Sequence, residues 1–132
     1  METPEIEVML AKLCEAFDQE AERQETLLAA VRAQTGAALA RDINLLEDRT
    51  AAVSMLLRET VGAEAGRLAL VRAVVAHYGL PTGDQTLSGL IAVAPEPWRG
   101  RMAEFQQRMK TVLAETRTAV GQNQAILRQA AK

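Results

Sequence analysis

The fold follows most directly from residues 98–130, which read WRGRMAEFQQRMKTVLAETRTAVGQNQAILRQA. One set of positions in this stretch advances by alternating steps of four and three: Trp98, Met102, Phe105, Met109, Val112, Thr116, Ala119, Asn123, Ile126 and Ala130. Steps of three and four keep side chains on one face of an α-helix and are the period of a coiled-coil seam. The stretch therefore predicts a long helix, beginning near Pro97, whose seam packs against other helices.

Two further long helices are expected before it. Thr3-Pro4-Glu5 is a typical helix start, with Thr3 as the N-cap. The apolar stripe that follows consists of Ile6, Leu10, Leu13, Phe17, Gln24, Leu28 and Val31. Asp42 is expected to cap a second helix. Its predicted stripe consists of Ile43, Leu46, Val53, Leu57, Leu68, Val71, Val75 and Tyr78, widened by Leu45, Leu56, Val61 and Val74.

The middle of the second helix is its weakest part, because Gly62 and Gly66 each cost on the order of 1 kcal/mol relative to alanine inside a helix. Either the helix breaks at residues 62–66, or the small residues let a neighbouring backbone approach closely. A continuous helix is favoured. The clearest stop follows in residues 78–84, YGLPTGD, where Gly79 suits a C-terminal cap and Pro81 blocks continuation.

Leu87, Leu90 and Ile91 have the spacing of a short helix, and prolines at 95 and 97 end it. The expected fold is all-α: an elongated antiparallel bundle of three long helices plus one short helix, in a single domain covering residues 1–132. The expected helices span about 4–40, 43–78, 85–94 and 97–130, and none of the pattern is typical of a strand.

Composition agrees with this fold and narrows the function. The chain has 132 residues, 48% of them hydrophobic but only 3% aromatic, and a net charge of −2. That charge gives no argument for nucleic acid or an anionic membrane as a partner. It is unevenly placed, since residues 1–25 carry eight acidic and two basic residues, and residues 96–132 carry three acidic and seven basic residues. The first and last helices are therefore expected to lie side by side.

The chain is expected to be cytoplasmic. It has one cysteine, so no intrachain disulfide can form and no oxidising compartment is implied. The acidic start lacks the basic and apolar regions of a signal peptide. No window approaches the roughly 18 consecutive apolar residues of a membrane span.

The sequence offers no chemistry for an enzyme. His77 and Cys14 are the only histidine and cysteine. A Cys–His pair across the bundle is one interpretation, and a buried structural cysteine is the favoured one. No Glu-x-x-His pair and no glycine-rich phosphate loop is present, so neither a metal nor a cofactor is expected.

The last helix carries two apolar lines, Val112–Ala119–Ile126 and Leu113–Val120–Leu127. One line can face the bundle while the other is left for a partner helix. The alternative is that both lines are core and the polar positions set the register. Asn123 has the same two interpretations: a polar residue in an apolar seam fixes register, or it bonds a bound client.

Three stretches of the chain resemble a known family: residues 40–47 (ARDINLLE), residues 67–71 through 78–80 (RLALV and YGL), and residues 115–127 (ETRTAVGQNQAIL). The pattern is similar to the FlgN-type flagellar export chaperones, small cytoplasmic proteins that escort hook–filament junction subunits to the type III secretion gate. The likeness covers nearly the whole chain in helix order and length. The related chaperone for the filament cap is also a small helical protein, so the identity of the client stays open.

The resemblance implies that the last helix receives the helical C-terminal segment of a junction protein. The client-binding residues it implies are Val112, Leu113, Thr116, Ala119, Val120, Asn123, Ile126 and Leu127. The expected partners are the junction subunits and the export gate, and the expected state is a monomer or weak dimer. The alternative function is a homo-oligomeric helical scaffold or adaptor without a secretion role.

Overall fold

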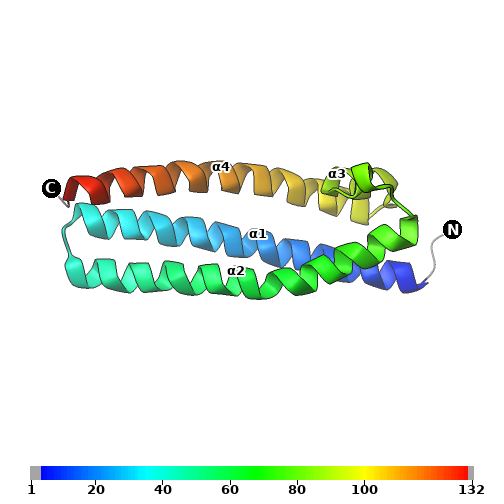
Figure 1. Ribbon diagram of the computed structural model, residues 1–132, viewed down its shortest axis with the longest axis horizontal. Helices are drawn as coiled ribbons and strands as arrows, with labels where there is room; N and C mark the ends of the chain where they lie inside the picture. Colours follow the sequence, from blue (N-terminus) through cyan, green and yellow to red (C-terminus); the bar gives the residue numbers. More distant parts are fainter. Residues whose placement is uncertain (1–3, 131–132) are drawn as a thin grey trace. The chain divides into compact units, whose positions relative to one another are not determined.

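The computed structural model describes residues 4–130, and within them every regular element is helical (Figure 1). The elements are α1 (Pro4–Leu39), α2 (Ile43–Tyr78), a 3-10 turn η1 (Thr82–Asp84), α3 (Leu87–Val93) and α4 (Trp98–Ala130). The predicted all-α helical bundle is confirmed. The short helix is two residues shorter at its start and one at its end than predicted. Thr86 is extended and serves as its N-cap, and Ala94 is extended because it precedes Pro95. Thr3 and the side chain of Ala130 lie outside what the structure describes.

The helix ends form as the sequence predicts. The Asp42 carboxylate accepts a hydrogen bond from the Leu45 amide at 3.0 Å, which caps the start of α2. Gly79 ends α2 with φ +59°, a left-handed conformation that glycine adopts without strain. A further cap, which was not predicted from the sequence, is Thr86, whose hydroxyl accepts a hydrogen bond from the Gly89 amide at 3.1 Å at the start of α3. These local signals depend only on neighbouring residues, so they can be recognised before the fold is known.

Helix α2 is continuous through residues 62–66, as favoured from the sequence. Gly62 and Gly66 are both exposed, and a Cβ atom added at either would have nothing within 4 Å. The two glycines therefore do not mark a close approach of another backbone.

The chain divides into two compact units. Unit 1 comprises Met1–Ala21 and Ala63–Arg108, and unit 2 comprises Glu22–Gly62 and Met109–Lys132. In unit 1 the contacts between α1 and α4 run from Cys14–Trp98 to Phe17–Phe105, so the residue numbers of the two helices rise together. In unit 2 they run from Arg32–Glu115 to Gln34–Asn123 and rise in the same way. Segments of α1 and α4 therefore run parallel within each unit, and α2 returns antiparallel to α1 after the short turn at residues 40–42.

Unit 1 has a completely buried core. Its fully buried large side chains come from all four helices: Ile6, Leu10, Leu13, Cys14, Val74, Leu90 and Met102. The rings of Phe17 and Phe105 stack with centroids 4.4 Å apart, joining α1 to α4. Unit 2 has a smaller cluster from α1 and α4, packed against partly buried residues that include Val53 and Leu56 of α2: Leu27, Leu28, Val31, Val112 and Ala119.

The predicted stripe of α2, with its widening positions, is wrong at four positions. These are Ile43, Leu57, Val61 and Leu68, which are 70%, 49%, 70% and 40% exposed. Val74, one of the predicted widening positions, is buried. The spacing of the apolar residues could not settle which face of α2 is turned toward the core, because apolar residues occur on several sides of this helix.

Contacts inside each unit explain which face of α2 is turned toward the core. In unit 1 the buried carboxylate of Glu20 pairs with Arg67 at 3.2 Å. A buried charge is stable only with a partner, so Arg67 must face α1, and Leu68, about 100° further round the helix, turns outward. In unit 2 Leu56 packs on the core, which leaves its neighbour Leu57 outside.

Candidate helix-binding surface

The two apolar lines of α4 have different environments in unit 2. Val112 and Ala119 of the first line are buried, and Ile126 is half-buried. Leu113, Val120 and Leu127 of the second line are 43%, 37% and 37% exposed; these three residues are called the α4 row. Each follows a residue of the first line by one position, a rotation of about 100° around the helix. The chain therefore leaves one line of apolar side chains at its surface, beside a line that it buries.

The α4 row lies on a defined side of the helix. Glu115, three residues after Val112, pairs with Arg32 of α1 at 3.7 Å. Three residues of an α-helix correspond to a rotation of about −60°, whereas one residue corresponds to about +100°. Glu115 and Leu113 are therefore on opposite sides of the buried line, and the α4 row faces away from this contact with α1.

A chain of polar side chains runs from the core of unit 2 to its surface. The buried Asn123 donates from Nδ2 to Gln34 Oε1, and Gln34 Nε2 donates to Thr50 Oγ1 at 2.9 Å, so α4, α1 and α2 are joined by two side-chain bonds. Such a specific bond favours one register of the helices over others. Among the residues described, Asn123 Oδ1 and Thr116 Oγ1 are buried without a hydrogen-bond partner. Each buried polar atom left unpaired costs about 1–3 kcal/mol, so this core is less stable than an apolar one of the same size.

The end of unit 2 carries a hollow of about 850 Å³ where the α1–α2 turn meets the end of α4. It is lined by Ala37, Ala38, Leu39, Arg41, Asp42, Ile43, Leu46, Ile126, Leu127 and Gln129. Leu39 and Ile43 are largely exposed in it, and Leu127 belongs both to the hollow and to the α4 row. The apolar surface of α4 therefore continues into the hollow. Sequence reasoning missed this feature, because it assigned Ile43 to the core.

Exposed apolar side chains are concentrated in unit 2. Of the eleven large ones in the described chain, three belong to unit 1: Val8, Leu68 and Val93. The other eight belong to unit 2: Leu39, Ile43, Met55, Leu57, Val61, Leu113, Val120 and Leu127. Contiguous exposed apolar surface on a protein commonly marks an interaction site. Unit 2 is therefore the better candidate for partner binding.

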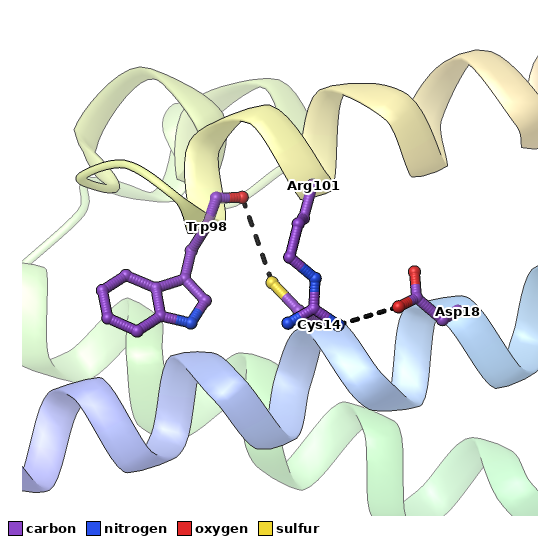
Figure 2. Close-up of polar contacts among 4 residues, drawn as sticks. All are labelled: Cys14, Asp18, Trp98 and Arg101. Atoms are coloured by element: carbon purple, nitrogen blue, oxygen red, sulfur yellow. Dashed lines mark hydrogen bonds and ion pairs between the residues drawn. The ribbon is translucent and has the colours of Figure 1, made fainter.

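The predicted candidates for chemistry lie in unit 1 and make structural contacts. Figure 2 shows Arg101 of α4 reaching toward Asp18 of α1, with an N–O distance of 2.8 Å, and the Cys14 thiol next to the Trp98 carbonyl oxygen at 3.9 Å. Burial raises the pKa of Cys14, while the charge of Arg101 acts in the opposite direction. The hydrogen bond that Arg101 donates to Asp18 raises the pKa of the guanidinium. The thiol is therefore kept protonated and joins α1 to α4.

His77 lies in the last turn of α2, with its ring edge-on to Tyr78 at 4.9 Å between centroids. It is not among the partners of Cys14, which are Trp98, Arg101 and Asp18. Within residues 4–130 there is no group of three or more His, Cys, Asp or Glu residues placed to hold a metal ion. No helix in that part of the chain combines the length and the apolar character needed to cross a membrane.

Comparisons with protein-family models, curated proteins and solved structures give no match to this chain. A proposal for function therefore rests on the surface of unit 2 and on the sequence pattern.

Proposed function

We propose that this protein is a chaperone that binds an amphipathic helix of another protein on the α4 row, and that it acts as a FlgN-type export chaperone for hook–filament junction subunits. The observation that carries the proposal is the exposure of Leu113, Val120 and Leu127 beside a buried apolar line of the same helix. The family likeness of the sequence pattern supports the choice of client. In this proposal the protein uses no cofactor and catalyses no reaction.

The spacing of the α4 row suits a helical partner. Its residues are seven apart, so they repeat every two turns and extend over roughly 21 Å of helix. A partner with apolar residues at i, i+3, i+4 and i+7 lays a complementary stripe along such a line. The hollow at the end of unit 2 extends the same surface past Leu127. A client segment of about four turns would cover the row.

The size of this surface suits temporary binding. Complete burial of a Leu or Val side chain contributes about 1.5–3 kcal/mol, and the α4 row is already more than half covered by its own chain. A client that folds on binding also loses conformational entropy, which lowers the affinity further. We expect a complex that protects an aggregation-prone tail in the cytoplasm and still releases it at the export gate.

The test replaces the two most C-terminal residues of the row, Val120→Glu with Leu127→Glu, and measures binding to C-terminal segments of junction subunits by calorimetry. The double variant is expected to lose binding by at least about 100-fold, because two charges would be buried against an apolar stripe. Its melting temperature should change little, since both positions are exposed. Leu57→Glu with Val61→Glu is the matched control, since it adds the same two charges at an exposed leucine and an exposed valine of unit 2 on α2.

Two results would contradict the proposal. A folded double variant that still binds with the affinity of the original chain would move the site away from α4. If the unchanged protein binds no segment of any junction protein, the export-chaperone assignment is wrong.

A second candidate function, a homo-oligomeric scaffold, is favoured by the exposed Leu57 and Val61, which lie one turn apart on one face of α2 where a second copy could cover them. Light scattering of the protein alone separates the two functions. A monomer or a weak, concentration-dependent dimer agrees with the chaperone, whereas a tight oligomer that Val61→Glu dissociates supports the scaffold.

A further inference from the structure

Three basic side chains border the α4 row. Lys110, Arg117 and Arg128 are all exposed, and helical geometry places them on one side of the row, roughly a quarter-turn from it. Within residues 4–130 no ion pair involves any of the three. Their positive charges are therefore available to a molecule that lies on the row.

No acidic residue of α4 offsets this charge on the same side of the helix, and Asp42, which lines the hollow with Leu127, is accompanied there by Arg41. The only carboxylate in residues 109–130 is Glu115, which lies across the buried line and pairs with Arg32. Arg117 is four residues after Leu113 and three before Val120, so it is one turn from each. Lys110 is one turn before Leu113. The row is thus an apolar line with a positively charged edge.

We infer that the helix bound by the α4 row carries Asp or Glu residues beside its apolar stripe. This inference rests on the helix-binding function proposed above and states the chemistry of the partner. Packed helices lie about 8–10 Å apart, a distance that Lys and Arg side chains can span to reach the edge of a neighbour. Arg117 and Arg128 can each hold a carboxylate through two parallel hydrogen bonds.

The local charge differs in sign from that of the whole molecule. The net charge of −2 would, if anything, attract basic partners. A preference for acidic partners can therefore arise only from a local surface such as the edge of the α4 row.

The same edge disfavours a second copy of the chain on this surface. In an antiparallel self-pair of α4, identical edges face each other, which would place Lys110, Arg117 and Arg128 against basic residues of the second copy. Like charges in apposition weaken an interface and select against that partner. An acidic-edged helix from a different protein fits both the apolar and the charged part of the surface.

The experiment uses three synthetic helical peptides with one leucine stripe and with Glu, Gln or Lys at the positions beside it. Binding to the full chain is measured by fluorescence anisotropy at low and high salt. The Glu peptide is expected to bind about tenfold more tightly than the Lys peptide at low salt. A few exposed ion pairs together would produce a difference in affinity of this size. The difference should shrink as salt screens the charges.

Two double variants that lose the same number of positive charges show which basic residues cause the preference for the Glu peptide. Lys110→Gln with Arg117→Gln should remove most of the preference for the Glu peptide. Arg49→Gln with Arg58→Gln removes the same charge from exposed positions on α2 and should leave the preference intact.

The outcomes separate this inference from the function on which it rests. Equal binding of all three peptides, each abolished by Val120→Glu with Leu127→Glu, would overturn the charge preference and leave helix binding standing. Tighter binding of the Lys peptide would also overturn it. Binding of none of the peptides and of no segment from the junction proteins would overturn both.

Discussion

The two units of the chain differ in how completely they cover their own apolar residues. All seven of the largest fully buried side chains belong to unit 1, whereas the unit 2 core retains slight exposure at every large apolar residue. Unit 2 also contains the unpaired buried atoms of Thr116 and Asn123 and most of the exposed apolar side chains. The comparison indicates that unit 1 is the better-packed part of the chain, and we propose that unit 2 is less stable because its exposed apolar residues serve for binding.

The packing of unit 2 affects how often this unit opens locally. Regions with few buried contacts and poorly satisfied polar groups open at a lower free-energy cost than well-packed regions. We therefore expect unit 2 to open locally more often than unit 1.

The first prediction compares the same substitution in the two cores. Leu10→Ala in unit 1 should cost about 2–5 kcal/mol of unfolding free energy, because it leaves a cavity around a completely buried site. Leu28→Ala in unit 2 should fall at or below the lower end of that range, since its looser surroundings can relax. Urea unfolding followed by circular dichroism measures both. A larger loss for Leu28→Ala would reverse the comparison.

The second prediction compares two glycines. A Cβ at Gly89 in unit 1 would lie 1.9 Å from the Asp84 carbonyl oxygen, so Gly89→Ala must move backbone and should cost about 1–3 kcal/mol. Gly121→Ala on α4 meets open space and should stabilise the chain by about 0.5–1 kcal/mol. Thermal melts of the two variants should move in opposite directions. Equal shifts would show that the contact between η1 and α3 is not tight.

The third prediction concerns the polar residue in the core of unit 2. Asn123→Leu removes a buried amide whose Oδ1 has no partner in the described chain, and it adds apolar contact. It loses one bond to Gln34, which is only half-buried and can bond water instead. We expect a gain of about 1 kcal/mol in unfolding free energy. Asn44→Leu, at an exposed position of α2, is the control and should change stability little. A loss of stability would mean that the register set by Asn123 outweighs its desolvation.

The smallest effect is expected at Cys14. Because burial raises the pKa of its thiol above the ordinary 9.0, less thiolate is present at pH 8 in the folded chain than in the unfolded chain. Alkylation by iodoacetamide should be slower for the folded chain than in urea, and the rate should keep rising above pH 9.0. The raised pKa also means that stability decreases as the pH rises past 9.0, because the unfolded thiol loses its proton first.

A matched variant extends this measurement to unit 2. Cys14→Ala with Val31→Cys moves the only thiol to a core position of unit 2 that is 3% exposed and does not line the hollow. If unit 2 opens more easily, this thiol should react faster than Cys14 in the original chain. A slower reaction would contradict the expected difference in opening.

The buried faces of α1 and α4 were predicted well, because the apolar positions of each predicted stripe recur at regular helical steps of three, four or seven. The predicted positions of α1, such as Leu10 and Leu28, are buried, and so are Met102 and Val112 of α4. The rotation of α2 could not be predicted in the same way. It depends on the Glu20–Arg67 pair, which joins residues far apart in the sequence.

The candidate site was predicted in part. The sequence identified two apolar lines on the last helix but left open whether one or both are buried, because that depends on how closely the other helices pack around α4. The hollow at the end of unit 2 gave no sequence signal, since Ile43 follows the pattern of a core residue. The basic residues of the last helix were assigned to contacts with the acidic first helix. Arg101 makes such a contact with Asp18, whereas Lys110 and Arg117 have no ion pair within residues 4–130.

The most direct test follows leucine and valine methyl signals by NMR while a peptide from the C-terminal end of a junction protein is added to the labelled full chain. The account predicts that the methyls of Leu113, Val120 and Leu127 shift most, with little change at Leu10, Leu13 and the exposed Val8 of unit 1. Shifts centred on unit 1, or a spectrum that does not respond to the peptide, would contradict the claim that the α4 row binds a helical client.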